Sequence, residues 1–381
     1  MQDTVRGFSR SVAISAVLAA TMAAAVACST SGTVVTGGAV SGANHSTSTA
    51  SGAAASGSGP APANQSLVSG QPGRPGPPTT SASAPDVTVT QGEAVAALEA
   101  YQSANNAVNA ALDIPGEAKI ESGSLLTLDQ GSLLYYQGIG GAKAAQSKVP
   151  VSFADPVFYI ARSVAYPRGF YVTVDTVQPG APGTGTLLHF AQEQAGAPWL
   201  VDTTLSLTAG RQWPAFAVGA DGLLDYTATQ LTQLPLSTTD LAVADRTLLT
   251  DDNAGTPGSP FASDDVSTTE QKWIQDGTSG VSPATVTLTV STTTAPLPTY
   301  LPLKDGGELA IYGTRVSLRA TQAGRTFTFA DQGWAKIAGA QTAEGGFTTD
   351  SVWMVAAIDP PEKSGKIQKI AYNGGLVSVE H

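Results

Sequence analysis

The chain has few thiols and few imidazoles, with one cysteine and three histidines in 381 residues. A single thiol cannot form an intramolecular disulfide, and structural zinc sites need several cysteine or histidine ligands. His45 lies in a low-complexity stretch and His381 is the last residue, so His189 is the one histidine of a strand-like segment. Disulfide frameworks and zinc sites of the usual kind are therefore excluded.

Positive charge is also scarce, with 19 basic residues against 30 acidic ones and a net charge of −11. Nucleic-acid binding depends on neutralising phosphates, and electrostatic attachment to anionic lipid needs basic clusters. Glycine-rich stretches at 138–143 and 180–185 lack the Gly-Lys-Ser/Thr ending of phosphate loops. We therefore expect no nucleic-acid partner and no cofactor.

Long apolar runs are missing too, because the stretch from Val12 to Ala27 has only 16 residues. A membrane-spanning helix needs roughly 20. Arg6 and Arg10 precede this stretch, and small or β-branched residues end it directly before Cys28. A basic head, an apolar centre and small residues at the end are typical of a secretory signal peptide, here residues 1–27.

A cysteine directly after the signal peptide resembles the lipobox of bacterial lipoproteins, although Ala25 stands where that pattern prefers leucine. The resemblance implies that Cys28 is acylated and holds the protein on the extracellular face of the cell membrane. Two or three acyl chains anchor firmly where one is marginal. Loss of Asp3, Arg6 and Arg10 would leave 29 acidic and 17 basic residues, a net charge of −12.

Residues 28–88 are poor in the aromatic and branched side chains that offset the conformational entropy of folding. Between Ser29 and Pro85 the only charged residue is Arg74. We therefore expect a disordered tether, which as a random coil would reach about 40 Å.

Residues 89–235 and 236–381 each begin with a helix signal and continue into strands. Thr90 and Glu93 form a capping box before an apolar periodicity of three and four residues. Residues 237–240 resemble that start, and a second box is predicted at Ser267 and Glu270. Strands are predicted after each helix, at segments that include the aromatic pairs at 135–136 and 170–171 and the stretch 325–339. One ring of each pair is expected in the core and the other outside.

A helix followed by an antiparallel meander, twice over, is an α+β arrangement. It resembles the cystatin-like and nuclear-transport-factor-like superfamily, in which a curved sheet wraps a long helix. The whole layout is similar to uncharacterised actinobacterial lipoproteins with tandem modules of this kind. Because the sequence contains no catalytic motif, we expect a non-enzymatic, membrane-tethered envelope lipoprotein that binds a partner protein, a wall component or a small ligand.

Two other kinds of chemistry were considered. His189 with Asp202 on the next strand is the pair that a Ser-His-Asp relay needs, but the chain has no Gly-x-Ser-x-Gly elbow. A structural His189 is favoured. The loop at 251–265 carries hard oxygen ligands for calcium, but their spacing fits no EF-hand and turn chemistry explains them. We favour no metal, with calcium as the alternative at Asp251, Asp252, Asp264 and Asp265.

The apolar connector at 212–237 is expected to pack against both halves, because its leucines and aromatic residues need burial. Clefts between packed units are favoured binding sites. We therefore predict a ligand site in the groove beside this connector, near Tyr166, Arg168 and Trp199. The alternatives are an envelope hydrolase that uses two carboxylates, glycosidase-like, and a purely structural spacer.

Overall fold

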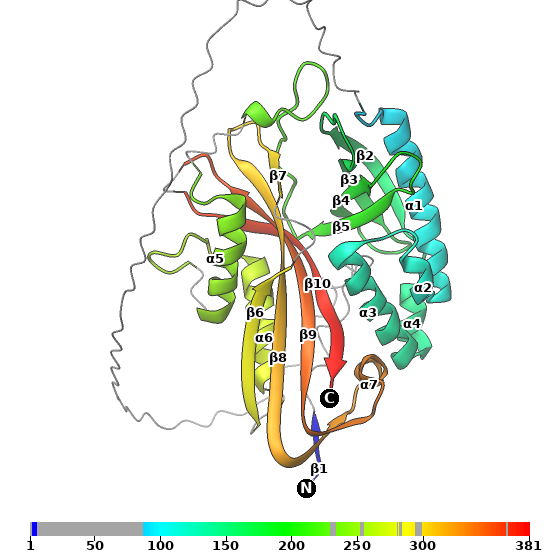
Figure 1. The fold of residues 1–381 in the computed structure, drawn as a ribbon, viewed down its shortest axis with the longest axis vertical. Helices are drawn as coiled ribbons and strands as arrows, with labels where there is room; N and C mark the ends of the chain where they lie inside the picture. Colours follow the sequence, from blue (N-terminus) through cyan, green and yellow to red (C-terminus); the bar gives the residue numbers. More distant parts are fainter. Residues whose placement is uncertain are drawn as a thin grey trace, which may run out of the picture. The chain divides into compact units, whose positions relative to one another are not determined.

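A large antiparallel sheet with helices on both of its faces organises the chain in a computed structural model (Figure 1). The structure describes residues 2–5, 87–228, 234–251, 255–279, 281, 284–293, 299–362 and 365–381. The described residues belong to one compact unit. Cys28 and the predicted tether up to residue 86 lie outside them.

The elements follow one another as helices, strands, helices and strands. The helices are α1 (Gln91–Ala111), α2 (Ile114–Glu117), α3 (Gly123–Ile139), α4 (Gly141–Ser147), α5 (Thr238–Asp251), α6 (Asp265–Ser279) and α7 (Gln332–Ala338), with a short 3₁₀ turn η1 (Tyr226–Ala228). The strands are β1 (Gln2–Val5), β2 (Ser152–Ile160), β3 (Arg168–Val177), β4 (Thr184–Gln192), β5 (Leu200–Leu207), β6 (Thr285–Thr292), β7 (Thr299–Pro302), β8 (Glu308–Phe329), β9 (Thr342–Asp359) and β10 (Gln368–Glu380).

The strands of both predicted halves join one ten-stranded sheet. Its order is β1-β8-β9-β10-β5-β4-β3-β2, with β6 and β7 also paired to β8. The halves meet where β10 pairs antiparallel with β5, at Ala371 opposite Leu207 and Tyr372 opposite Ser206. The predicted α+β class is confirmed, and the sheet runs continuously across the boundary that was placed between two domains.

β1 lies within the segment predicted to be a signal peptide. It pairs parallel with β8, from Gln2 opposite Thr326 to Val5 opposite Phe329. Removal of residues 1–27 would therefore leave this edge of β8 without that partner.

The predicted start of the first helix is confirmed. The Thr90 hydroxyl accepts a hydrogen bond from the Glu93 N–H at 3.2 Å, and the Glu93 carboxylate accepts one from the Thr90 N–H at 2.8 Å. Leu98, Tyr101 and Val108 lie on its buried face, as the periodicity predicted. The buried face of α1 packs in one core with residues of β3, β4 and β5.

The first part of β8 is buried on both faces. Leu309 and Ile311 belong to the core under α1 and α3, whereas Ala310 and Tyr312 pack with α5. Successive strand residues point to opposite faces, so a strand covered on both sides is apolar throughout. This explains why the sequence here lacks the alternation of a one-sided sheet.

The connector packs against both halves, as predicted. Phe216 and Leu224 are buried in the core that contains residues of β3 and β9. The Ala217 N–H donates to the Pro302 carbonyl at 2.8 Å, and the Leu224 N–H donates to the Ile160 carbonyl at 2.8 Å. The described part of the connector therefore joins the two halves by backbone hydrogen bonds as well as by apolar burial.

Two segments predicted as strands are helical. Tyr135 and Tyr136 lie on α3, where both rings are buried. Residues 332–338 form α7, capped by the Asp331 carboxylate, which accepts hydrogen bonds from Gly333 and Trp334 N–H. Gly333 lies against the Tyr135 ring, so close that an added Cβ would be 2.1 Å from it. Helix packing between α3 and α7 overrides the β-propensity of these aromatic residues.

The in-and-out expectation for aromatic pairs was wrong at Phe170 and Tyr171. Both are buried, at 1% and 7% exposure. Phe170 stacks on Phe190 of β4, centroid distance 4.7 Å, whereas Tyr171 lies 4.3 Å from the His189 ring. β3 is therefore covered on both faces: Phe170 on one face packs in the core under α1, and Tyr171 on the other face packs against His189.

Candidate functional site

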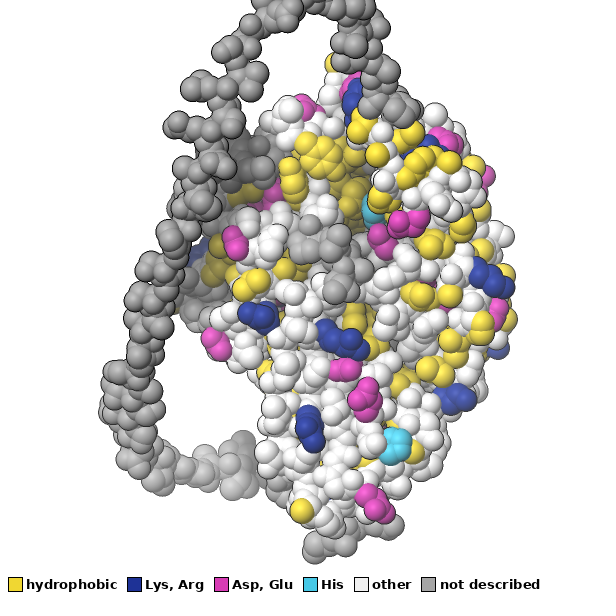
Figure 2. All heavy atoms as spheres, in the orientation of Figure 1, with side chains coloured by type: hydrophobic (Ala, Val, Ile, Leu, Met, Phe, Trp, Pro, Cys, Tyr) yellow, Lys and Arg dark blue, Asp and Glu magenta, His cyan; other side chains and the backbone are white. Residues whose placement is uncertain are grey.

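The candidate site is a cavity of about 530 Å³ beside the connector, called the Tyr171 pocket. This volume is within the usual range for small-molecule sites. Figure 2 shows a histidine and acidic side chains next to hydrophobic ones on the face in view. The lining residues are Ser122, Gly123, Ala161, Ser163, Pro167, Arg168, Gly169, Tyr171, His189, Ala191, Glu193, Asp202, Thr203, Tyr226 and Thr299.

The pocket contains the His189–Asp202 pair that the sequence suggested. β4 and β5 place the two side chains next to each other, with His189 Nδ1 2.8 Å from Asp202 Oδ1. Burial alone would raise the pKa of Asp202, but the His189 imidazole and the hydroxyl of Thr203 hold it below its usual value. An ionised Asp202 therefore orients the imidazole.

Two tyrosines supply the aromatic part of the lining. Burial, with the nearby Tyr226 and Asp202, raises the pKa of Tyr171. Burial and Tyr300 raise the pKa of Tyr226 to about 12. Both phenols therefore remain neutral hydrogen-bonding groups at physiological pH. Tyr226 is 37% exposed, which leaves part of its ring open to a ligand.

Tyr166, Arg168 and Trp199, which were predicted to mark the site, lie close together. Of these three residues, only Arg168 lines the Tyr171 pocket. The Arg168 guanidinium lies between two rings, 5.5 Å from the Tyr166 centroid and 5.3 Å from that of Trp199. It also donates to Glu93 Oε1 at 2.6 Å and to Gln192 Oε1 at 2.9 Å. Arg168 thereby ties β3 to α1, and its charge is already matched.

Trp199 lines a neighbouring cavity of about 420 Å³ instead. That cavity lies along α1, where Ala97 and Tyr101 form part of its wall together with Pro198. The sequence therefore predicted the location of the pocket better than its lining, because Tyr166 and Trp199 are not part of that lining and Trp199 packs on Phe170 in the core under α1 instead.

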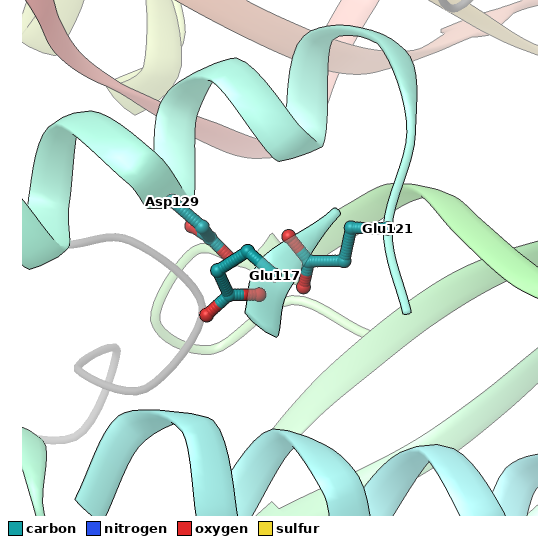
Figure 3. A group of neighbouring side chains, drawn as sticks. All are labelled: Glu117, Glu121 and Asp129. Atoms are coloured by element: carbon teal, nitrogen blue, oxygen red, sulfur yellow. The ribbon is translucent and has the colours of Figure 1, made fainter. Parts of the chain in front are cut away.

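A second candidate site, not foreseen from the sequence, is a group of three buried carboxyl groups, called the acidic triad. Glu117, Glu121 and Asp129 each place one oxygen within 4.8 Å of the others (Figure 3). They are 1%, 1% and 6% exposed. The Tyr101 hydroxyl donates to Glu121 Oε1 at 2.8 Å. Each of the three side chains has a buried oxygen without a hydrogen-bond partner among the described residues.

Burial dominates the electrostatics of the triad. It raises the pKa of Glu117 to about 8, with a further contribution from Asp129, and the pKa of Asp129 to about 7. Burial and both neighbouring acids raise the pKa of Glu121 well above its usual value. Like charges in a site that excludes water disfavour ionisation, so the triad needs protons or a cation.

A family model described as Domain of unknown function (DUF8094) matches residues 85–381. The chain belongs to this family. The match spans both halves of the sheet and contains the Tyr171 pocket and the acidic triad. No curated protein and no solved structure gives a significant match.

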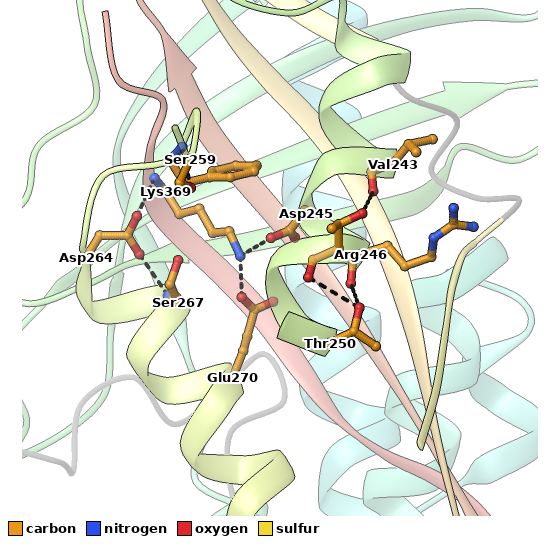
Figure 4. A network of polar contacts seen from close by, with 11 residues as sticks. Val243, Asp245, Arg246, Thr250, Ser259, Asp264, Ser267, Glu270 and Lys369 are labelled. Atoms are coloured by element: carbon orange, nitrogen blue, oxygen red, sulfur yellow. Dashed lines mark hydrogen bonds and ion pairs between the residues drawn. The ribbon is translucent and has the colours of Figure 1, made fainter. Parts of the chain in front are cut away.

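The DUF8094 domain also has a buried lysine, Lys369 of β10, which is 0% exposed (Figure 4). Its ammonium forms ion pairs with Asp245 of α5 and with Glu270 of α6, the latter at 2.5 Å. Burial would lower the pKa of Lys369, but the two carboxylates raise it above its usual range. The lysine therefore stays charged and links two helices to the sheet.

This network corrects the predicted capping box at Ser267 and Glu270. α6 begins at Asp265, and the Asp264 carboxylate accepts the Ser267 N–H at 2.7 Å. Glu270 is turned to Lys369 instead, because a buried lysine needs a counter-charge more than a helix end needs a second cap.

The same contacts involve Asp264, one of the four aspartates of the calcium alternative for the acidic loop. Asp264 also accepts the backbone N–H of Lys369 at 3.1 Å, so both of its oxygens are used within the protein. Asp251 and Asp265 are exposed, and Asp252 lies outside the described residues. Among the residues that the structure describes, the acidic group with metal-ligand spacing is the triad, which contains none of these aspartates.

Membrane insertion through a helix has no candidate in the described part of the chain: none of its helices combines the length and the apolar character that a crossing needs.

Proposed function

We propose that this DUF8094 protein is a cell-envelope lipoprotein, anchored in the membrane through Cys28, that binds a ligand or partner without catalysing a reaction. The Tyr171 pocket is the observation that carries the binding part of this proposal. A structural spacer would need no such cavity. The lipobox-like sequence before Cys28 supports the anchor.

The lining of the pocket favours a neutral or amine-bearing ligand with a ring that can lie on tyrosine. Its carboxylates, Asp202 and Glu193, repel anions, and the positive charge of Arg168 is matched by Glu93. Tyr171 and Tyr226 offer ring surface and hydroxyl groups in the same space. Neutral saccharides and amino sugars of the cell wall have this chemistry, so we assign the pocket to a saccharide fragment of the wall.

Titration of the full chain with soluble, peptide-free disaccharide fragments of cell wall tests this assignment. We expect one fragment bound per chain by calorimetry. The Tyr226→Ala variant should bind up to about tenfold more weakly, because an aromatic contact is worth about 0.5–1.5 kcal/mol. Val243→Ala on α5, 42% exposed and outside the pocket, should leave the affinity unchanged. If the wild-type titration gave no heat of binding, the assignment of the Tyr171 pocket to a wall fragment would be contradicted.

A carboxylate-dependent hydrolase remains the second candidate, because Glu193 and Asp202 line one cavity. Glycosidases need two carboxyl groups about 5–9.5 Å apart. The same incubation distinguishes the two functions: new reducing ends that disappear in Glu193→Gln would identify a hydrolase. Unchanged fragments would leave the binding role.

The anchor predicts the behaviour of Cys28→Ser. Without the thiol no diacylglycerol can be attached, so we expect the variant in the medium or as an unprocessed precursor. Ser29→Ala, one residue on, should stay with the membrane fraction. Cell fractionation followed by mass spectrometry of the first mature peptide measures both. Tight membrane association of unlipidated Cys28→Ser would contradict the anchor.

We further infer that the two halves are tandem modules of cystatin-like or nuclear-transport-factor-like type. Each half places at least one helix before its antiparallel strands, α1 before β2–β5 and α5 before β6–β10. A superposition of residues 89–235 on 236–381 that fails to align helix and strands in the same order would contradict the duplication.

A further inference from the structure

We propose that Glu117, Glu121 and Asp129 bind a divalent cation, with calcium as the ion that suits them. This site is separate from the Tyr171 pocket, and its test does not depend on the proposed ligand or on the anchor.

The spacing of the three carboxyl groups fits a shared ion. Calcium–oxygen bonds are about 2.3–2.6 Å long, so two ligands of one ion lie at most about 5 Å apart. One oxygen from each triad residue lies within 4.8 Å of the other two. Figure 3 shows the three carboxyl groups gathered between α3 and the segment that precedes it.

The second observation concerns buried oxygens of these side chains that accept no hydrogen bond from a backbone, hydroxyl, amide or cationic donor among the described residues. These oxygens are Glu117 Oε2, Glu121 Oε2 and Asp129 Oδ1. A buried polar atom without a partner costs about 1–3 kcal/mol, and more when charged. A cation among the three side chains would neutralise their charge, and it would compete with the protons through which Glu121 hydrogen-bonds to Glu117 and Asp129.

The backbone around the triad is held firmly, as a metal site requires. The Val201 N–H donates to the Ile120 carbonyl at 2.9 Å, and the Ser122 N–H donates to the Val201 carbonyl at 3.0 Å. These bonds fix Glu121 against β5. Asp129 lies on α3, which approaches β10 so closely at Gly131 that an added Cβ would be 2.7 Å from the Leu376 carbonyl oxygen.

The choice of ion follows from the ligands. All three are hard carboxylate oxygens, the ligands of calcium and magnesium, whereas zinc and copper sites are usually built with nitrogen or sulfur. Magnesium needs ligands at about 2.0–2.1 Å, so oxygens that share it are at most about 4.2 Å apart. Magnesium also keeps most of its waters and rarely sits in an all-protein cage, whereas calcium accepts several carboxylates in a flexible geometry, so a buried set of three carboxylates favours calcium.

A bound ion would join three parts of the first half. It would link α2 to α3 directly, and α1 indirectly through the Tyr101 hydroxyl on Glu121. The cation therefore stabilises the packing of α1–α3 on the sheet, next to the cavity that Tyr101 and Trp199 line.

Calorimetric titration of the chelator-treated full chain with calcium chloride tests the proposal. We expect one ion per chain with a dissociation constant at or below about 1 mM. At calcium 100-fold above that constant, the thermal midpoint should rise by about 5 °C. Magnesium chloride, titrated in parallel, should bind at least about tenfold more weakly.

Variants locate the ion. Glu117→Gln/Asp129→Asn keeps the side-chain shapes and should weaken calcium binding at least about 100-fold, with loss of the thermal shift. Glu117→Asp, which keeps the charge and shortens the side chain, should weaken binding about tenfold. Asp251→Asn/Asp265→Asn in the exposed acidic loop and Glu344→Gln on β9 are matched controls and should bind as the wild type does.

Two results would overturn the proposal. The first is a chelator-treated wild-type chain that binds no calcium and has the same midpoint with and without it, which would leave protons as the occupants of the triad. The second is calcium binding that survives in Glu117→Gln/Asp129→Asn and disappears in Asp251→Asn/Asp265→Asn. The wild-type titration by itself shows whether the first result holds, even if a variant fails to fold.

Discussion

Replacement of Lys369 by methionine should cost about 3–5 kcal/mol of unfolding free energy. The ammonium is fully buried between Asp245 and Glu270, which are 0% and 1% exposed at their side chains. Removing the lysine leaves two buried acids without a counter-charge, and each must either stay ionised at a high cost or take up a proton. Urea denaturation with an unchanged m-value measures the loss.

This cost should depend on pH. Burial raises the pKa of Glu270 to about 8 even with Lys369 present, above its usual value of 4.5. A raised folded-state pKa means that stability is present below pH 4.5 and is lost as pH rises toward 8. Without the lysine the pKa rises further, so Lys369→Met should be more destabilising at pH 8 than at pH 5.

Two variants control this prediction. Lys272→Met removes the lysine of an exposed pair with Asp276 on α6 and should change stability by less than about 1 kcal/mol. Adding Asp245→Asn and Glu270→Gln to Lys369→Met should recover most of the loss. A single Lys369→Met variant as stable as wild type at pH 8 would show that the lysine does not neutralise these acids.

Replacement of Phe190 by alanine should cost about 3–5 kcal/mol as well. Phe190 is 0% exposed, stacks on Phe170 and meets the Tyr101 ring edge-on at 5.7 Å. Truncation leaves a cavity that two flat rings cannot collapse to fill. Because Tyr101 also holds Glu121, we expect calcium affinity to fall in this variant too.

Val157→Ala on β2 is the control variant for Phe190→Ala. Val157 is 49% exposed, and changes at such positions usually stay within ±0.5 kcal/mol. Urea midpoints of both variants, recorded with and without calcium, separate the packing effect from the effect on the triad. A loss below about 1.5 kcal/mol for Phe190→Ala would mean that this core relaxes freely.

Local rules in the sequence were sufficient for much of the fold. The capping box at Thr90 and Glu93 and the strands at β3 and β4 follow from hydrogen bonds and periodicities within a few residues. The same local rules failed at Tyr135 and at residues 332–338, where two helices pack on each other. Propensity is a weak prior that tertiary packing overrides.

The candidate sites were harder to predict, with one instructive exception. His189 and Asp202 are 13 residues apart on adjacent strands, and β-alternation was enough to pair them. The acidic triad had a signal that was not used: Glu117 and Glu121 are spaced by four in a segment that leads directly into an apolar helix. Acidic residues so placed are expected either at the surface or with a partner.

The sequence by itself determined the α+β class, the starts of α1 and α5, most of the strands and the prediction of a lipid anchor at Cys28. Tertiary structure decided that β5 and β10 meet to make one sheet, and that Lys369 pairs with Glu270, 99 residues away. The reason is physical. Caps and periodicities are energies between neighbours in sequence, whereas a buried charge is stabilised by whichever partner the packing of distant elements brings within reach.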